Sequence, residues 1–401
     1  MSTPAKSANP TAGAPRPPDS PQSGAQLQGA SGALPSRRAP GAHVMEIDDY
    51  GLDELLGLAV ERRASDLHIT AGLPPTLRVD GRLQALNFDP LRPVDTQRLI
   101  YSILSDHQIS TFESTHELDF SHGIPKVGRF RVNVYVQRGS VGAAFRVIPR
   151  RIPRFPELGI PGVVQTLAAR TSGLILVTGP AGSGKSTTLA SIIDYINDTR
   201  SCHIVTIEDP IEYLHSHRKA MVNQRELGTD TYEIRAALRS VVREDPDVIL
   251  IGEMRDLETI DAALKIAETG HLVLATLHTR NAPQSVNRIV DVFPAHQQEQ
   301  IRVLLASTLE AIIAQQLLPK AAGSGRVLAA EILVVTAGIR NLIREGKTHQ
   351  IYSLMETGGE QGMQTMDRTL ALLVRQGMVS PEDAAARTID QDNYRRWLSH
   401  V

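Results

Sequence analysis

The sequence predicts an α/β protein that has a small α+β domain followed by a larger domain built on a parallel sheet. Two observations predict this class. In the first part, apolar and polar residues alternate, which is typical of antiparallel strands with one solvent-facing side. In the second part, short continuous apolar runs alternate with helical patterns, which indicates parallel strands covered on both faces. The length of 401 residues provides enough chain for two or three domains.

The predicted first domain covers residues 45–149. Apolar residues on one helical face predict a helix over 52–60. The dipeptide Asp80-Gly81, between short alternating runs, predicts a hairpin over 76–83. A second helix is expected near 94–106. Strands are then expected over 130–136, with arginines on its polar face, and over 143–148.

Residues 150–161 are predicted to form a linker, because Pro153 and Pro156 interrupt the strand pattern. The second domain then covers residues 162–401. Beyond about residue 296 it is predicted to be mainly helical, with one strand near 327–334. Its parallel strands are expected at 174–178, 203–207, 248–251 and 271–277.

Residues 1–44 differ in composition from the rest of the chain. They contain 8 Pro, 9 Ala, 5 Gly and 6 Ser and no aromatic residue. Such a segment cannot bury enough apolar surface to offset the entropy that it would lose on ordering. We expect a disordered extension, which either binds a partner or is dispensable.

The composition also excludes several classes of protein. A formal net charge of −2 gives no general attraction to nucleic acid or to anionic membranes. The single cysteine, Cys202, excludes an internal disulfide and a four-cysteine zinc site. No apolar run approaches the roughly 18–20 residues that span a bilayer, and the N-terminus lacks the apolar core of a signal peptide. We therefore expect a cytoplasmic protein with no nucleic-acid partner, which reaches a membrane only through other proteins.

A glycine-rich segment follows the predicted strand 174–178. It matches the phosphate-loop pattern of Gly, four residues and Gly-Lys-Ser, and a helical pattern continues over 187–197. Glycines let backbone N–H groups wrap a phosphate, and the helix N-terminus adds positive charge. Lys185 is expected to reach the β- and γ-phosphates and Ser186 to bind Mg²⁺; the alternative is a glycine turn that only starts a helix. The expected ATP-binding residues here are Gly179, Pro180, Ala181, Gly182, Ser183, Gly184, Lys185, Ser186 and Thr187.

Acidic and imidazole side chains follow three other predicted strands. Glu253 comes after the run 248–251, at the strand end where open α/β sheets bind ligands. It can orient or deprotonate the attacking water, or hold Mg²⁺ through water, unless it is a plain surface glutamate. Glu208 and Glu212 are candidates to orient water and Mg²⁺, with a solvated acidic loop as the alternative. His278 follows the strand 271–277, where an imidazole can sense a γ-phosphate, although a lone histidine there is more often packed or exposed.

The order and sequence of several segments along the chain resemble the secretion traffic ATPase family, in its branch of type IV pilus retraction motors. The resemblance covers residues 45–398. Near the C-terminus, Ile339–Glu345 resembles an element associated with retraction, with Gly338 in place of its leading alanine. The other segments are Ala64–His68 with Gly72–Pro75 and Arg78–Gly81, the phosphate loop, Glu208–Glu212, Pro246–Asp256, and Gly270–Thr279.

The resemblance implies a PAS-like first domain and a RecA-like ATPase core, assembled as a homohexamer with ATP and Mg²⁺ at its subunit interfaces. It implies that Mg-ATP hydrolysis powers pilus retraction and twitching motility through an inner-membrane platform protein, which places the motor at the inner face of the cytoplasmic membrane. It also implies that arginines of the first domain approach the triphosphate. The candidates are Arg129, Arg131 and Arg146, of which Arg131 and Arg146 are assigned to the nucleotide. The expected catalytic residues are Glu253, Glu212, Glu208 and His278, with Ser186 and Glu253 at the metal.

Other functions remain open from the sequence. A pilus-extension or type II secretion ATPase would usually carry a four-cysteine zinc element, which a chain with only Cys202 lacks. An accessory retraction ATPase is a closer alternative. A non-catalytic scaffold is disfavoured by the presence of Glu253 and Glu212, and a DNA translocase by the lack of a DNA-reading module.

Overall fold

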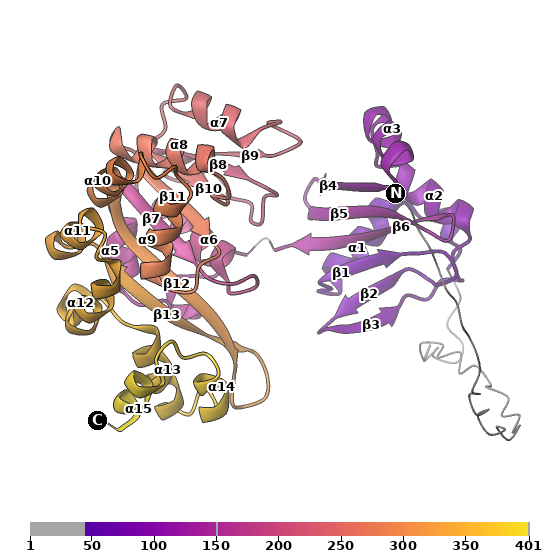
Figure 1. Ribbon diagram of the computed structural model, residues 1–401. Coiled ribbons are helices and arrows are strands. Elements are labelled where there is room, and N and C mark those ends of the chain that lie inside the picture. Colours follow the sequence, from indigo (N-terminus) through magenta and orange to yellow (C-terminus); the bar gives the residue numbers. More distant parts are fainter. Residues whose placement is uncertain (1–44, 150, 400–401) are drawn as a thin grey trace, which may run out of the picture. The chain divides into compact units, whose positions relative to one another are not determined.

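The computed structural model describes residues 45–149 and 151–399 (Figure 1). The extension expected over residues 1–44 therefore lies outside the described residues. The described parts confirm the predicted α/β class, with an antiparallel sheet in the first domain and a mainly parallel sheet in the second.

The first domain is a six-stranded antiparallel sheet with the strand order β3-β2-β1-β6-β5-β4. Helices α1 and α2 pack on the central strands β1 and β6, and their apolar faces close one core with Phe130 and Phe145. The predicted hairpin is confirmed, since Asp80 and Gly81 have φ of 50° and 78° at its turn. The elements are α1 (Leu52–Glu61), β1 (Asp66–Ile69), β2 (Thr76–Val79), β3 (Arg82–Ala85), α2 (Pro93–Tyr101), α3 (Asp106–Thr115), β4 (Glu117–Ile124), β5 (Gly128–Gln137) and β6 (Ser140–Ile148).

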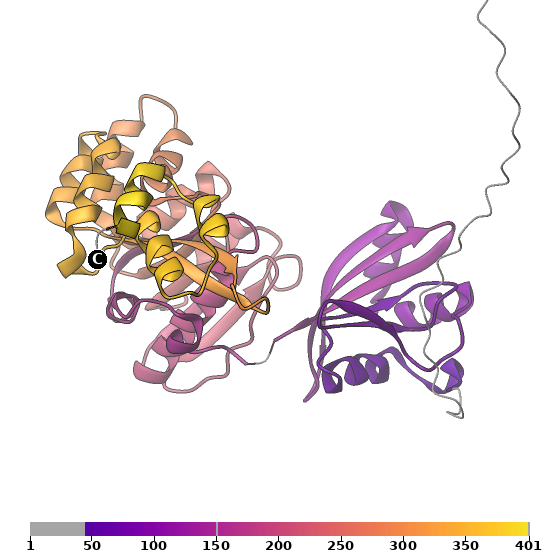
Figure 2. The ribbon, with the colours of Figure 1, turned by 90° about the horizontal axis from the view of Figure 1, so that it is seen from below.

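The second domain is a seven-stranded sheet with the order β13-β12-β7-β11-β10-β8-β9, in which only the β12–β13 pair is antiparallel. Helices lie on both faces of this sheet (Figures 1 and 2). Its elements up to the last strand are α4 (Phe155–Leu158), α5 (Val163–Ala168), β7 (Gly173–Thr178), α6 (Lys185–Thr199), β8 (His203–Glu208), β9 (Met221–Glu226), α7 (Ile234–Val241), β10 (Val248–Ile251), α8 (Leu257–Glu268), β11 (Leu272–Leu277), α9 (Ala282–Asp291), α10 (Gln298–Thr308), β12 (Leu309–Pro319) and β13 (Arg326–Val334).

The continuous apolar runs arise because both faces of the central strands are buried. Along β7, Leu174 and Leu176 join the core under α7 to α10, whereas Ile175 and Val177 join the core under α5 and α6. Every residue of β7 and of β11 is buried. A run of this kind is what a central parallel strand requires.

One prediction for this domain is wrong. The segment after residue 296 was expected to be mainly helical up to the strand near 327, but β12 occupies Leu309–Pro319. Leu309, Ile312 and Ile313 have helical spacing, yet this strand lies between β7 and β13 with apolar contacts on both faces, so its pattern does not alternate. Strand β9 of this domain was also not predicted. In the first domain, strands β1 and β4 were not predicted, and the helix expected near 94–106 ends at Tyr101, before α3 begins.

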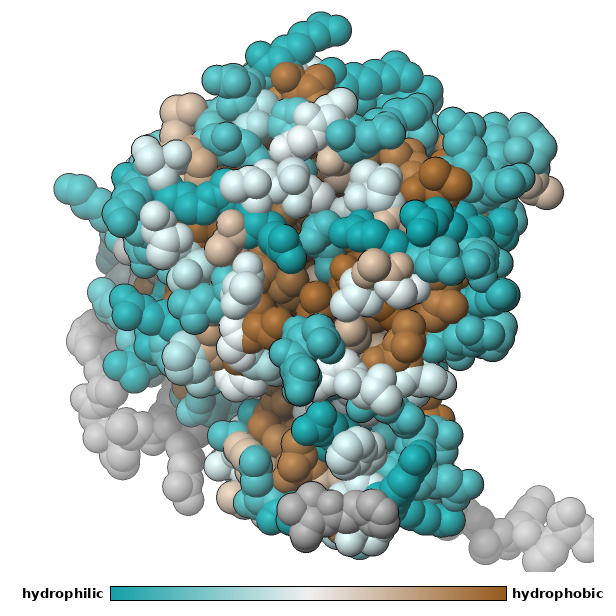
Figure 3. All heavy atoms as spheres, turned by 90° about the vertical axis from the view of Figure 1, so that its left-hand side faces the viewer, coloured by the Kyte–Doolittle hydropathy of each residue, from teal (hydrophilic) through white to brown (hydrophobic). Residues whose placement is uncertain are grey.

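The chain ends in a group of short helices. Apolar residues from α13, α14 and α15 pack on the end of β12 and on β13, with Leu318 and Ala329 at the centre. Figure 3 shows the face that lies at the left of Figure 1, where apolar side chains are exposed among polar ones. The helices are α11 (Ala337–Arg344), α12 (Ile351–Thr357), α13 (Met366–Arg375), α14 (Pro381–Ala385) and α15 (Gln391–Ser399).

Two further features bear on the predictions. The expected linker includes the one-turn helix α4, whose Phe155 ring packs 5.5 Å from the Tyr195 ring of α6. Within residues 45–149 and 151–399, no helix is both long enough and apolar enough to cross a membrane.

Candidate active site

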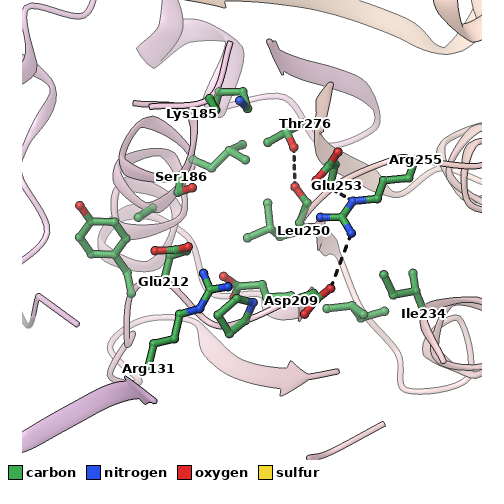
Figure 4. Close-up of a pocket in the computed structure, with 18 of the residues that line it drawn as sticks. Arg131, Lys185, Ser186, Asp209, Glu212, Ile234, Leu250, Glu253, Arg255 and Thr276 are labelled. Atoms are coloured by element: carbon green, nitrogen blue, oxygen red, sulfur yellow. Dashed lines mark hydrogen bonds and ion pairs between the residues drawn. The ribbon is translucent and has the colours of Figure 1, made fainter. Parts of the chain in front are cut away.

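Four parallel strands deliver the predicted site residues to one edge of the large sheet. Strands β7, β11, β10 and β8 are neighbours, and their carboxyl ends meet at this edge. A cavity of about 520 Å³ opens there, within the size range of small-molecule sites (Figure 4). The predicted residues that line it are Arg131, Arg146, Ala181, Gly182, Lys185, Ser186, Glu208, Glu212, Glu253 and His278.

The phosphate loop connects β7 to α6 in a shape that glycine permits. Gly179 has φ of 144°, and a Cβ there would lie 2.4 Å from the Gln315 carbonyl oxygen and 2.6 Å from Ser183 Oγ. Gly184, with φ of 91°, directly precedes the first residue of α6. The first N–H groups of α6 have no intrahelical acceptor, so this end of the helix favours an anion.

Lys185 is the buried cation of the cavity. Its side chain donates to the carbonyl oxygens of Gly179 at 2.9 Å and Pro180 at 3.1 Å. Burial lowers the pKa of Lys185, and the nearby Glu253 carboxylate opposes that shift. An anionic phosphate in the cavity would compensate for this burial more fully than two neutral carbonyl groups do.

The other loop residues have different surroundings. Ser186 is exposed on the cavity. Thr187 Oγ1 is 3.0 Å from the Tyr213 hydroxyl, and Pro180 lines a separate cavity. Ser183 is buried, and no group in the described parts of the chain is hydrogen-bonded to its hydroxyl.

Glu253 and His278 are brought together across the sheet edge. Glu253 Oε1 lies 3.1 Å from His278 Nε2, and its Oε2 lies 2.9 Å from Arg255 Nε. Arg255 also comes within 4.0 Å of Asp209 (Figure 4). The Glu253 carboxylate is therefore held between His278 and Arg255 at the edge of the cavity.

The two other acidic candidates have contrasting environments. Glu208 is buried and accepts hydrogen bonds from Thr206 Oγ1 at 2.7 Å and Gln224 Nε2 at 3.2 Å. Burial raises its pKa. Glu212 is exposed and lines the cavity, so its carboxylate is the better placed of the two to meet water or a metal ion.

The arginines of the first domain lie side by side on adjacent strands. Arg131 on β5 is the cross-strand partner of Arg146 on β6, and both line the cavity. Arg146 is held by Asp66, whose Oδ1 lies 3.0 Å from Arg146 Nε. Arg129, the third candidate, pairs instead with Glu226 at 3.1 Å.

The donor set of the cavity fits Mg²⁺ bound together with phosphate. This ion prefers hard oxygen ligands and usually keeps one or two carboxylates, several waters and phosphate oxygens. The Ser186 hydroxyl and the carboxylates of Glu212 and Glu253 provide such ligands. In the described ranges, no group of three or more His, Cys, Asp or Glu side chains is arranged to hold a metal ion by itself.

Sequence reasoning missed Arg255 as a site residue. It lies on the cavity and contacts both Glu253 and Asp209. Its position two residues after Glu253, at the same strand end, was the available signal. Tyr213, which contacts the phosphate-loop helix through Thr187, gave no comparable signal because it lies in an irregular segment.

Residues 161–386 match the family described as type II/IV secretion system protein, and this match covers more than half of the chain. The chain belongs to this family. The matched residues include the phosphate loop and the strand ends that carry Glu208, Glu253 and His278.

Three curated relatives are similar to this chain over most of its length. The type IV pilus retraction ATPase PilT of Pseudomonas aeruginosa is 50% identical over 343 residues, which are 86% of this chain and 99% of the relative. The twitching motility protein of Neisseria gonorrhoeae is 47% identical, covering 82% of this chain and 90% of the relative. The type IV pilus ATPase PilU of P. aeruginosa is 43% identical, covering 86% and 90%.

A solved structure of the family has the same fold. The crystal structure of the pilus retraction motor PilT with bound ADP is 53% identical and superimposes with a TM-score of 0.82. It covers 87% of this chain and is itself covered completely. The similarity therefore includes both described domains.

Proposed function

We propose that this protein is the ATP-hydrolysing motor of type IV pilus retraction, which supports twitching motility. The observation that carries the proposal is the meeting of Lys185, Ser186, Glu253 and His278 on one cavity of a secretion-family ATPase. The relatives that are 50% and 47% identical are a pilus retraction ATPase and a twitching motility protein. ATP is the expected nucleotide, and the related motor was crystallised with ADP.

Each cavity residue has a role that follows from its chemistry. The loop N–H groups and Lys185 bind the β- and γ-phosphates, replacing the carbonyl contacts that Lys185 makes at 2.9 and 3.1 Å. Ser186, with Glu253 or Glu212 through water, would hold Mg²⁺, which neutralises phosphate charge when bound. Glu253 orients the attacking water and accepts its proton, while His278 and Arg255 fix the position of its carboxylate.

The arginines of the first domain would complete the site. Arg131 and Arg146 can neutralise charge on the triphosphate, and Asp66 restrains Arg146 through a contact of 3.0 Å. Glu208 is buried, and its Oε1 accepts hydrogen bonds from Thr206 and Gln224, so its main role would be to support the segment that carries Glu212.

The assembly proposed is a homohexamer that acts on an inner-membrane platform protein of the pilus machinery. This would hold the motor at the inner face of the cytoplasmic membrane through its partner. Hydrolysis at successive subunits would move the two domains relative to each other and drive withdrawal of pilin subunits. The similarity to a pilus retraction motor over 87% of the chain supports this choice of cargo.

An accessory retraction ATPase is the second candidate, because PilU is also 43% identical. The higher identity to PilT, 50% over 343 residues, favours the principal motor. A retraction assay in cells that lack one motor at a time separates the two, since an accessory ATPase cannot support retraction alone.

The proposal is tested by Glu253→Gln in the purified full chain. Removing a general base typically lowers turnover by roughly 10² to 10⁴-fold, while nucleotide binding through Lys185 is retained. Phosphate release and nucleotide affinity are measured on the same preparation. Wild-type turnover in Glu253→Gln would remove Glu253 from the mechanism.

A further inference from the structure

One buried carboxylate, distant from the cavity in sequence, joins two helices of the second domain. Glu331 lies on β13 and its side chain is 0% exposed. Its Oε1 accepts the N–H of Ala282 at 2.8 Å, and its Oε2 accepts the N–H of Met366 at 3.3 Å. Ala282 and Met366 are the first residues of α9 and α13, so a single side chain holds the starts of both helices.

Helix capping alone does not account for this arrangement, because both helices have another cap. The Asn281 side chain accepts the N–H of Gln284 at 2.9 Å in α9, and Thr365 Oγ1 accepts the N–H of Arg368 at 3.4 Å in α13. Glu331 therefore connects the two helices to each other, and neither helix depends on it alone for its N-terminal cap. Burying a carboxylate for this purpose is unfavourable unless its oxygens are hydrogen-bonded, as they are here.

One end of this connection leads to the cavity. The segment His278–Asn281 links β11 directly to α9, and its first residue contacts Glu253 at 3.1 Å. Thr279 Oγ1 lies 2.6 Å from Ser285 Oγ, which fixes the segment to the first turns of α9. His278 is therefore joined to the start of α9 by a short segment that is hydrogen-bonded to that helix.

The other end leads to the C-terminal helices. Asp367, which follows Met366 and is 0% exposed, accepts the N–H groups of Ile389 at 2.7 Å and Asp390 at 3.1 Å. The Tyr352 hydroxyl of α12 donates to the same carboxylate at 3.2 Å. Two buried carboxylates in series thus connect α9 with α12, with α13 and with the segment that leads into α15.

We propose that Glu331 is a positioning residue that couples the His278 segment of the active site to the C-terminal helices through α9 and α13. In this arrangement, contact of His278 with the nucleotide or with Glu253 changes the position of α9, and Glu331 transmits that change to α13. This inference rests on the proposed role of His278, and it goes beyond that role by adding a residue that touches neither nucleotide nor Glu253.

The test uses Glu331→Gln in the full chain, with Thr365→Ala as the matched control. Glutamine keeps the shape but offers only one acceptor oxygen, so one of the two helix contacts is lost. Thr365→Ala weakens the start of α13 and removes a hydroxyl that interacts with Tyr352, but it leaves both helix contacts of Glu331 in place. We expect kcat for ATP hydrolysis to fall roughly 10-fold in Glu331→Gln, the scale typical of a residue in a coupled network, with KM for ATP within about twofold. Thr365→Ala should keep kcat within about twofold of wild type.

Amide hydrogen exchange provides a readout that a purely structural role would not change. Addition of a non-hydrolysable ATP analogue should alter exchange both in the phosphate loop and in α13 of the wild-type chain and of Thr365→Ala. In Glu331→Gln the response of the phosphate loop should persist and that of α13 should be lost. An α13 response equal to that of wild type would overturn the proposal, and so would equal losses of kcat in both variants.

Two further variants keep the outcome decisive. If Glu331→Gln does not fold, Tyr352→Phe removes only a hydroxyl, which donates to Asp367 and also interacts with Glu331. It should reduce the α13 response in the same direction, and an unaltered response would overturn the coupling. If kcat is normal in Glu331→Gln but ATP turnover is lost in His278→Ala, this inference is overturned and the proposed function is left intact. A normal kcat in His278→Ala would remove the role of His278 itself.

Discussion

Substitution of Gly179 by alanine tests the geometry of the phosphate loop before any nucleotide is bound. The added Cβ would lie 2.4 Å from the Gln315 carbonyl oxygen and 2.6 Å from Ser183 Oγ. Both distances are far below van der Waals contact, and the first neighbour is backbone in the buried strand β12, which cannot turn aside as a side chain could. Overpacking of this kind costs about 1–3 kcal/mol. The φ of 144° adds about 1–3 kcal/mol for a residue other than glycine.

Gly182 is the matched control in the same loop. It also has positive φ, at 74°, but a Cβ there would meet nothing within 4 Å. Gly182→Ala should therefore cost only the backbone term, about 1–2 kcal/mol. The two backbone terms are of similar size, so the difference between the two variants is mainly the overpacking term of about 1–3 kcal/mol. At about 2–4 °C per kcal/mol for a domain of this size, the melting temperature of Gly179→Ala should be roughly 2–12 °C lower.

The assay is thermal unfolding of the nucleotide-free full chain, followed by circular dichroism or calorimetry. Working without nucleotide keeps any clash between the new methyl group and a phosphate out of the comparison. A melting temperature for Gly179→Ala equal to or above that of Gly182→Ala would refute the packing of the loop against β12.

Three other predictions concern separate parts of the chain. Lys185→Ala should abolish measurable ATP turnover, because no other cation of the described residues is buried beside the loop carbonyls; an unchanged kcat would contradict this role. Gly338→Ala should stabilise the chain by about 0.5–1 kcal/mol in chemical unfolding, because Gly338 lies in helix α11 and its Cβ would meet Leu354 Cδ1 of α12 at an ordinary 3.5 Å; a loss of stability would show that the glycine is required. Burial raises the pKa of Glu331 to about 7 from 4.5, with Asp367 and Tyr352 facing it, so the folded chain binds this proton more tightly than the unfolded chain. The free energy of unfolding should therefore fall as pH rises from about 5 to 7, by up to about 1.4 kcal/mol per pH unit, and this part of the slope should be missing in Glu331→Gln; equal slopes in the two proteins would contradict it.

The parts of the site that are local in sequence could be predicted. The phosphate loop and Glu253 each follow a continuous apolar run, and the run itself indicates that the residue after it lies at the ligand-binding edge of a parallel sheet. The strand ends therefore identify the candidate residues before their distances are known. His278 follows from the same rule, and the structure adds that it lies 3.1 Å from Glu253.

Features that depend on contacts between distant segments could not be predicted. Strand β12 has the apolar spacing of a helix, and only its place between β7 and β13 makes it a strand. Glu331 is one glutamate in an apolar strand, and its role depends on Ala282 and Met366, which lie far from it along the chain. The charge of Glu208 and Glu212 is visible in the sequence, but the burial that separates their environments is not.

The central claim, that this motor withdraws pili, is tested most directly in host cells that carry Glu253→Gln as their only copy. The measurement is the number of surface pili per cell, together with surface motility. If ATP hydrolysis at this site drives retraction, pili should accumulate and twitching should be lost, while the variant protein remains present at wild-type level. Cells without pili would contradict the account, because they would show that the motor drives extension.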